Sequence, residues 1–256
     1  MEPVIRVFAR DFSAARHTVD SGDGRDGSYV VTPGGAWCRR LFIVGALTER
    51  RGSGDVMRAR IADPTGTFHV SADWQSPDAV ETLGYIEPPA FVAVTGRATL
   101  NGSGSRAYAG LDAEAINVVD RTARDIWVLA TAGATLGRLE ALEKALGGGG
   151  DERAATVIGL YGTTGKDIQD KAGMVRTALA SVLPDLAVGE IAPVAGRDLL
   201  LAAIEDEGGA RGIPESDAVA LGVRSGLSAR DAQRALEELL AAGECYQPAS
   251  DMIKPI

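Results

Sequence analysis

The sequence predicts an α+β protein in which a five-stranded β-barrel is followed by a long helix, a small helical region and a winged-helix domain. Three observations predict this order. Short segments that alternate apolar and polar residues lie between positions 37 and 120, a long helical repeat follows, and three capped helices lie near the end. We therefore divide the chain into a leader over 1–36, a barrel over 37–120, a helical region over 121–183, a linker over 184–197 and a winged helix over 198–256.

The leader is expected to pack on the barrel. Ile5, Phe8, Ala9 and Phe12 have helical spacing, so residues 4–15 predict a short amphipathic helix. Residues 29–32 predict a short strand, which ends where proline and glycine follow.

The barrel prediction depends on alternation within its strands. In residues 56–62 the alternation places Arg58 and Arg60 on one face of the sheet and three apolar residues on the other. Proline and glycine in residues 63–66 predict a tight turn, after which His69 in the return strand joins the arginine face. The other expected elements are strands over 41–48, 90–99 and 106–118 and a helix over 76–85. This is the order of an OB-fold, whose second and third strands commonly bind oligonucleotides.

Single-stranded nucleic acid is bound by flat groups that stack on bases, interleaved with cations that meet the phosphates. The residues that fit these roles on the predicted outer face and nearby loops are Arg58, Arg60, His69, Trp74, Arg97 and Arg106. Plainer roles stay open: the arginines can form a solvated face, the histidine can be a hydrogen-bonded surface residue, and Trp74 can cap the barrel. Tyr108 is left unassigned. With two or three stacking groups, we expect binding by the isolated chain to be weak and strongly salt-dependent.

The net charge of −9 argues against a nucleic-acid-binding protein until its distribution is considered. Residues 37–60 hold six arginines against two acids, a local balance of +4. Residues 151–256 hold 17 acids and 10 bases. Charges farther apart than about 8 Å are largely screened at physiological ionic strength, so the local arginines decide what docks on the barrel.

A long apolar stripe follows the barrel. Residues 123–146 carry apolar side chains mostly at helical spacing, including Ile126, Trp127, Ala130, Ala134, Leu136, Leu139, Leu142 and Leu146. This helix is longer than a barrel plug requires. Its stripe either docks against another subunit or packs on its own chain, and the spacing does not decide between the two.

The winged-helix prediction comes from three short helices that begin near Asp198, Pro214 and Ser228, followed by a short β segment. In the third helix, Ala232, Ala235, Leu236, Leu239 and Leu240 form the apolar stripe, and Arg230, Arg234, Glu237 and Glu238 point outward. A helix that reads DNA rarely places glutamates beside its arginines, so we expect this domain to bind protein.

Other functions are disfavoured. No constellation of nucleophile, base and carboxylate stands out, so we expect neither an enzyme nor a cofactor. The two histidines and two cysteines lack metal-ligand spacing. No apolar run approaches the ~20 residues of a membrane-spanning helix, and the first residues lack the apolar core of a secretion signal. We expect a cytoplasmic protein with no membrane partner.

Three stretches resemble archaeal proteins associated with replication protein A, which are similar to the middle subunit of eukaryotic replication protein A. They are residues 6–12 (RVFARDF), 58–68 (RARIADPTGTF) and 87–94 (EPPAFVAV), and the resemblance spans residues 4–145. Relatives tend to carry aromatic residues on the outer face of the third strand, where this chain has His69 and Ser71.

The resemblance implies an accessory single-stranded DNA-binding subunit of an archaeal replication protein A-type complex in DNA replication and repair. It implies that the 121–146 helix joins another OB-fold subunit and that the winged helix recruits replication or repair proteins. Two other hypotheses remain open: an OB-fold assembly scaffold without DNA contact, and a winged-helix transcription regulator.

Overall fold

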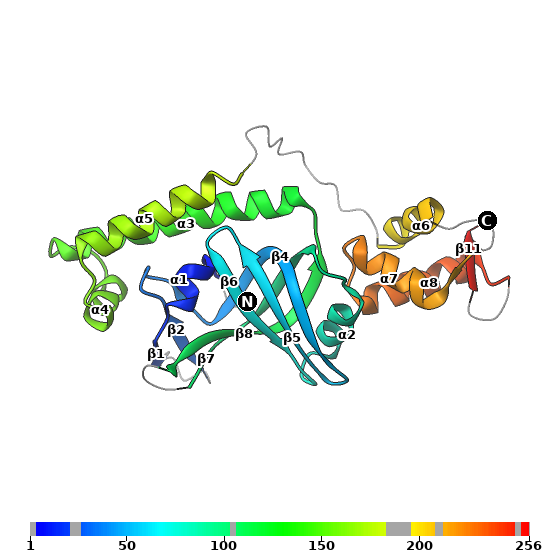
Figure 1. The fold of residues 1–256 in the computed structure, drawn as a ribbon, viewed down its shortest axis with the longest axis horizontal. Helices are drawn as coiled ribbons and strands as arrows, with labels where there is room; N and C mark the ends of the chain where they lie inside the picture. Colours follow the sequence, from blue (N-terminus) through cyan, green and yellow to red (C-terminus); the bar gives the residue numbers. More distant parts are fainter. Residues whose placement is uncertain are drawn as a thin grey trace.

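The computed structural model describes residues 4–20, 27–102, 106–182, 196–207, 212–248 and 252–255, without the side chain of Ser53. The predicted linker over 184–197 therefore lies almost entirely outside the described residues. The barrel occupies the middle of an elongated molecule, with α3, α4 and α5 at one side and the C-terminal helices at the other end (Figure 1).

Five strands close into the predicted barrel. In chain order the barrel elements are β4 (Arg40–Ser53), β5 (Val56–Asp63), β6 (Gly66–Ala72), α2 (Pro77–Tyr85), β7 (Ala90–Asn101) and β8 (Tyr108–Val118). Around the barrel the strands follow the order β4-β5-β6-β8-β7, and β7 pairs back to β4. Only the β6–β8 pair among these is parallel. Three strands, a helix and two strands in this order define an OB-fold topology.

The predicted alternation is confirmed on both central strands. Met57, Ala59 and Ile61 of β5 are buried, as are Phe68, Val70 and Ala72 of β6. Arg58, Arg60 and His69 are exposed between them. Gly45 lies where β4 closely approaches β5, because a Cβ at this position would be 2.5 Å from the carbonyl oxygen of Ala62.

The leader differs from its prediction. The expected helix over 4–15 is confined to α1 (Ala9–Ser13), because the backbone of Ile5 bridges to β4 instead. The Ile5 amide donates to the Arg40 carbonyl at 2.9 Å. The rest of the leader forms a separate three-stranded sheet of β1 (His17–Asp20), β2 (Ser28–Val31) and β3 (Trp37–Cys38). Trp37 thus pairs with the leader, and the barrel begins at Arg40.

The helical region consists of α3 (Arg121–Leu146), α4 (Glu152–Tyr161) and α5 (Gly165–Leu179). The Asp120 side chain caps α3 by accepting from the Ala123 amide at 2.8 Å. Trp127 is buried in the barrel core, where its indole Nε1 donates to the Phe42 carbonyl at 2.9 Å. Lys171 of α5 forms an ion pair at 2.8 Å with Asp11, a buried residue of α1. The long helix is therefore part of the fold of its own chain.

The C-terminal unit has its own apolar core. Its elements are α6 (Gly196–Glu207), β9 (Ile213–Pro214), α7 (Glu215–Arg224), α8 (Ala229–Ala242), β10 (Cys245–Tyr246) and β11 (Met252–Pro255), and its strands have the order β10-β11-β9. The turn between α7 and α8 rests on the barrel. There the Ala229 amide donates to the Thr82 hydroxyl at 2.8 Å, and the Asn117 side chain donates to the Gly226 carbonyl at 3.0 Å. Among the helices that the structure describes, none is both long and apolar enough to cross a bilayer.

Candidate nucleic-acid interface

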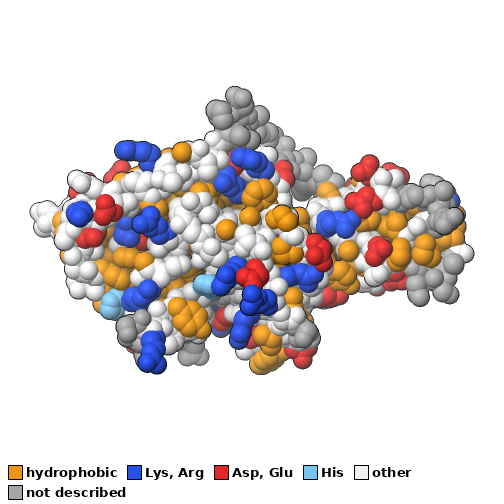
Figure 2. Space-filling view, in the orientation of Figure 1, with side chains coloured by type: hydrophobic (Ala, Val, Ile, Leu, Met, Phe, Trp, Pro, Cys, Tyr) orange, Lys and Arg blue, Asp and Glu red, His pale blue; other side chains and the backbone are white. Residues whose placement is uncertain are grey.

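A groove of about 820 Å³ crosses the outer face of β5 and β6. The residues after β6 and the first residues of β8 also line it. We call this the barrel groove, and its principal lining residues are Glu49, Arg51, Val56, Arg58, Arg60, His69, Ser71, Asp73, Trp74, Asn101, Tyr108, Gly110 and Asp112. Figure 2 shows arginine or lysine side chains, a histidine and a few carboxylates gathered over the barrel strands. The groove therefore lies on the face where OB-folds commonly bind oligonucleotides.

Four of the six predicted residues meet in the barrel groove. Arg60 and His69 are direct partners in the β5–β6 ladder, and Arg58 and Ser71 are partners two residues further along it. Because side chains two positions apart share a face, these residues project together from the sheet. Trp74 joins them from the segment that follows β6.

Two aromatic side chains of the groove are open to solvent. Trp74 is 72% exposed and Tyr108 is 55% exposed, so neither fills the barrel interior. The segment that carries Trp74 is held by Asp73, whose carboxylate accepts from the Gln75 amide at 2.9 Å and whose carbonyl accepts from the Ser76 amide at 2.8 Å. Exposed aromatic rings beside arginines provide flat surfaces on which bases can stack.

The sequence left Tyr108 unassigned, although its position carried a usable signal. It is the first residue of β8, directly opposite Asn101 at the end of β7. Alternate residues after it, Gly110 and Asp112, also line the groove. An aromatic residue at an outward position of β8, the fifth strand of the barrel, is therefore as good a candidate for base stacking as one on β6, the third strand.

The arginines do not form one cationic patch. Glu49 pairs with both Arg51 and Arg60, the latter at 3.4 Å. Arg50 points elsewhere and forms an ion pair with Glu87 at 2.8 Å. The predicted local balance of +4 is thus dispersed, because strand alternation, a register shift in β4 and barrel closure send neighbouring side chains in different directions.

Arg58 is the exception among the groove arginines. Its side chain is exposed, and no carboxylate of the described residues forms an ion pair with it. With Asp73 and Asp112 also on the lining, the groove holds three arginines and three acids. Stacking must therefore contribute more to any base-binding affinity than net charge does.

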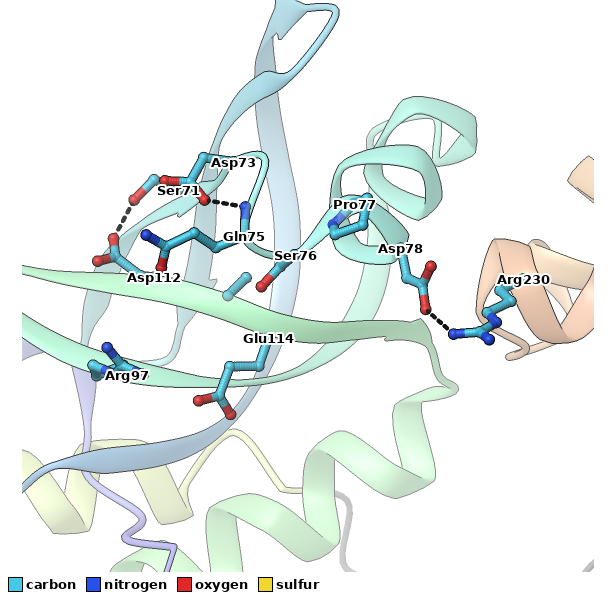
Figure 3. Close-up of a pocket in the computed structure, with 11 residues that line it drawn as sticks. Ser71, Asp73, Gln75, Ser76, Pro77, Asp78, Arg97, Asp112, Glu114 and Arg230 are labelled. Atoms are coloured by element: carbon cyan, nitrogen blue, oxygen red, sulfur yellow. Dashed lines mark hydrogen bonds and ion pairs between the residues drawn. The ribbon is translucent and has the colours of Figure 1, made fainter.

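Two predicted residues lie outside this groove. Arg106 is exposed just before β8 and is not among the lining residues. Arg97 lies on β7 and lines a cavity of about 510 Å³ between the barrel and α8. We call this the carboxylate cavity, because it also contains Asp73, Asp78, Asp112 and Glu114 (Figure 3).

The tight turn between β5 and β6 is held to the leader by the Asp63 side chain. Burial raises the pKa of Asp63, while hydrogen bonds from the backbone amides of Ala9, Thr65 and Gly66 act in the opposite direction. The Ala9 amide donates at 2.7 Å and the Gly66 amide at 2.9 Å. One carboxylate thereby joins the leader to the hairpin that carries Arg58, Arg60 and His69.

The described residues contain no group of three or more histidines, cysteines and carboxylates arranged to hold a metal ion. Within the groove, the Asp112 carboxylate accepts from the Ser71 hydroxyl at 2.6 Å. Its position suits a structural hydrogen bond on the sheet surface. The chemistry offered by the groove is stacking, hydrogen bonding and charge.

No protein-family model matches the sequence, and no curated protein matches it either. Among solved structures, the chain is similar to a chain of a replication protein A heterotrimer bound to single-stranded DNA. That match has 17% identity and a TM-score of 0.40, and covers 54% of this chain and 98% of the other.

The chain is also similar to a chain of the Stn1–Ten1 complex of S. pombe, with 14% identity and a TM-score of 0.41 over 51% of this chain and 90% of that one. A third likeness, to asparaginyl-tRNA synthetase from Pyrococcus horikoshii, has 17% identity, a TM-score of 0.29 and coverage of 32% and 20%. These likenesses are low, so we argue function from the barrel groove itself. Strand order and groove together define an OB-fold protein with an accessible strand-face groove.

Proposed function

We propose that this protein is an accessory single-stranded DNA-binding subunit of an archaeal replication protein A-type complex that acts in DNA replication and repair. One observation carries the DNA-binding part. Two exposed aromatic rings, Trp74 and Tyr108, line the same groove as Arg58, an exposed arginine that forms no ion pair with any residue the structure describes.

The groove favours single strands over duplex. Stacking needs unpaired bases whose faces are open, and each stacked base contributes about 1–3 kcal/mol. The arginines and carboxylates of the groove balance, so phosphate attraction is limited to a few contacts. We therefore expect modest affinity for the isolated chain, with a shallow salt dependence in place of the strong one that the sequence predicts.

The test is a titration of a labelled oligothymidylate of about 16 nucleotides, followed by fluorescence anisotropy, beside a hairpin duplex of equal length. Salt is varied from about 50 to about 200 mM. We expect single strand to bind better than duplex, and Trp74→Ala and Arg58→Ala to weaken it. The matched control is Arg176→Ala, an exposed arginine on α5 that lies outside the groove. Preference for duplex, or equal binding by Trp74→Ala, would contradict the proposal.

The outer face of α3 supports the proposed assembly with another OB-fold subunit. Trp127, Leu139 and Leu142 pack inward on the chain itself. A second, solvent-exposed face carries no charge over about two and a half turns, and its residues are Leu129, Ala130, Gly133, Ala134, Leu136 and Gly137. Small residues beside leucines allow a second helix to approach closely.

Deleting α3 cannot test this assembly, because the deletion would also remove Trp127 from the barrel core. Replacing both Leu129 and Leu136 with aspartate changes only the exposed face. We expect this variant to lose a co-purifying OB-fold protein from native cells, as identified by mass spectrometry. Leu179→Asp, at an exposed leucine on α5, is the matched control and should retain it. Retention by both variants would contradict assembly through this face.

We further propose that residues 198–256 form a winged helix that recruits replication or repair proteins. The order of α6, β9, α7, α8, β10 and β11 supports this assignment. Arg234 of α8 pairs with Asp231 at 2.7 Å and Arg230 pairs with Asp78 of α2 at 3.6 Å, which leaves little free positive charge for a DNA groove. Sequence-specific duplex binding that is lost in Arg230→Ala/Arg234→Ala would instead support a transcription regulator.

The scaffold hypothesis keeps one specific observation in its favour, the equal number of arginines and acids in the barrel groove. A pure scaffold would assemble with its partner and retain no DNA through this face. Unchanged DNA retention by a reconstituted complex carrying Arg58→Ala and Arg60→Ala would favour the scaffold.

A further inference from the structure

A second cavity lies beside the barrel groove, on the β7 side of the barrel. It has a volume of about 750 Å³, and Arg39, Arg40 and Arg97 line it together with the hydroxyl-bearing residues Thr18, Ser28 and Thr99. We call it the arginine cavity. Among the lining residues that the structure describes, Glu114 is the only acid, and it accepts from Arg40 Nε at 2.5 Å. Among the described lining residues, three guanidinium groups stand against one carboxylate, a positive balance that the barrel groove lacks.

The two cavities are adjacent on one continuous sheet surface. Tyr108, Gly110 and Asp112 of β8 line the barrel groove, and their ladder partners Asn101, Thr99 and Arg97 of β7 line the arginine cavity. Neighbouring strands are only about 4.8 Å apart. Asn101 borders both cavities.

Between the two cavities, Gly110 contributes no side chain of its own, and the Thr99 and Asn101 side chains of β7 lie over it. A Cβ at this position would lie 3.1 Å from the Thr99 hydroxyl and 3.2 Å from the Asn101 side-chain nitrogen. Gly110 itself is buried beneath these two groups, so the surface between Tyr108 and the arginine cavity is formed by the small polar side chains of Thr99 and Asn101. An extended chain can cross it without displacing a side chain of β8 at this point.

A nucleic-acid strand that leaves the barrel groove can run toward the arginine cavity or toward the carboxylate cavity, and the charges of the two cavities favour the first. Beyond Ser71 and Asp112 lies the carboxylate cavity, where four acids face two arginines (Figure 3). A phosphodiester backbone would be repelled there and attracted into the arginine cavity. Arg97 is exposed on the border of both cavities, and no carboxylate of the described residues pairs with it.

We propose that the arginine cavity is a phosphate subsite that binds the sugar-phosphate backbone of nucleotides leaving the barrel groove. This inference rests on the proposed DNA-binding function. Guanidinium groups and hydroxyls are the usual protein ligands of phosphate oxygens, and the described part of the cavity lining contains no aromatic residue for base stacking. The subsite lengthens the footprint of the protein and supplies the salt-dependent part of its affinity.

The test compares the full chain with Arg97→Ala on oligothymidylates from about 4 to about 16 nucleotides. Short oligomers that fill only the barrel groove should bind both proteins equally. Longer ones should bind the variant about tenfold more weakly, the size of one charge-assisted contact. The slope of log affinity against log salt should fall by about 0.7 for the lost phosphate contact.

A second variant keeps the inference testable without removing an arginine. Thr99→Glu places a carboxylate on the passage between the two cavities. It should weaken the binding of long oligomers more than Arg97→Ala does and leave the binding of short oligomers unchanged. Arg176→Ala is the control for overall charge, and it should leave both lengths unaffected.

Several outcomes would overturn the subsite. Equal weakening of short and long oligomers by Arg97→Ala would indicate a general charge effect. Long oligomers that bind Arg97→Ala normally, while Trp74→Ala still weakens short ones, would reject the subsite and leave the proposed function intact. Failure of wild type to bind any length would reject the proposed function itself. Calorimetric binding of tripolyphosphate that disappears in Arg97→Ala, without any length effect on DNA, would assign the cavity to a free phosphate ligand.

Discussion

The outer face of β5 and β6 and the outer face of α8 both present arginines, but only the first leaves one without an acidic partner among the described residues. Arg58 stands in the barrel groove near two exposed aromatic rings. On α8, Arg230 and Arg234 both form ion pairs with carboxylates of their own chain. The first face can meet phosphates and bases, whereas the second is internally neutralised.

The difference teaches that counting arginines along a sequence does not locate a nucleic-acid site. What matters is whether each guanidinium has a partner and whether a flat group lies beside it. By this criterion, one arginine and two aromatic residues define the groove better than six arginines in 24 consecutive positions do.

The aromatic residues should give the largest effect. We expect Trp74→Ala and Tyr108→Ala each to lower single-stranded DNA affinity by about 5- to 150-fold, since each lost stack removes about 1–3 kcal/mol. Anisotropy titrations measure the change. Tyr246→Ala removes an exposed aromatic residue of the C-terminal unit and should change nothing. If Tyr246→Ala weakens binding as much, the contrast between the two regions is wrong.

At alkaline pH, a buried thiol on the barrel side, Cys38, should lower the stability of the fold more than Cys245 of the C-terminal unit does. Burial raises the pKa of the Cys38 thiol to about 12 from an ordinary value of 9.0. The folded state therefore holds the proton that the unfolded chain loses, so stability is full below pH 9 and declines as pH rises toward about 12. The expected loss approaches about 1.4 kcal/mol per pH unit within this window.

Urea unfolding between about pH 8 and pH 10.5 measures this slope. Cys38→Ala should flatten it, and Cys245→Ala, in the C-terminal unit, should flatten it less. Burial also raises the pKa of Tyr161, which adds a loss of the same sign at higher pH that both variants retain. An unchanged slope in Cys38→Ala would show that this thiol is not protected as described.

Releasing arginines in the groove should strengthen binding. Glu49→Gln removes the partner of both Arg51 and Arg60, so their guanidinium groups become available to phosphates. We expect a few-fold tighter binding at about 50 mM salt and a steeper salt dependence, by up to about 0.7 for each new contact. Asp231→Asn, which frees Arg234 on α8, is the matched control. If Asp231→Asn tightens DNA binding and Glu49→Gln does not, then α8 and not the barrel groove is the face that meets DNA.

The smallest effect is expected on α8. Arg230→Ala/Arg234→Ala should change single-stranded DNA affinity less than about twofold, because both side chains are already paired. Its stability should fall by less than about 1 kcal/mol per exposed pair. Anisotropy and urea unfolding measure the two quantities. A tenfold loss of affinity would place α8 on the DNA path.

The barrel was predictable because its signals are local. Alternation in β5 and β6, with a proline and glycine turn between them, determines which side chains face outward, and Arg58, Arg60 and His69 follow from it. Three helices near the end were predictable for the same reason, although Asp198, the predicted cap of the first, lies inside the first turn of α6, and α7 has no side-chain cap. Ser228 caps α8 as expected, with its hydroxyl accepting from the Asp231 amide at 3.1 Å.

The rest depends on contacts between distant residues. The pairing of Ile5 with β4 replaces part of a helix that spacing alone favours. The separation of Arg97 from Arg58 follows from the order β6-β8-β7, which periodicity within one strand cannot show. The neutralisation of Arg50 by Glu87 joins residues 37 positions apart. Such pairs are invisible to a reading of local patterns.

The most direct test of the barrel groove is the intrinsic fluorescence of its tryptophan. The chain has three tryptophans, of which Trp127 is buried and Trp74 is 72% exposed. If bases stack on Trp74, oligothymidylate should quench the emission in proportion to binding, and Trp74→Phe should bind with little remaining quenching. Quenching that persists unchanged in Trp74→Phe, or binding with no quenching in wild type, would contradict single-strand binding in this groove.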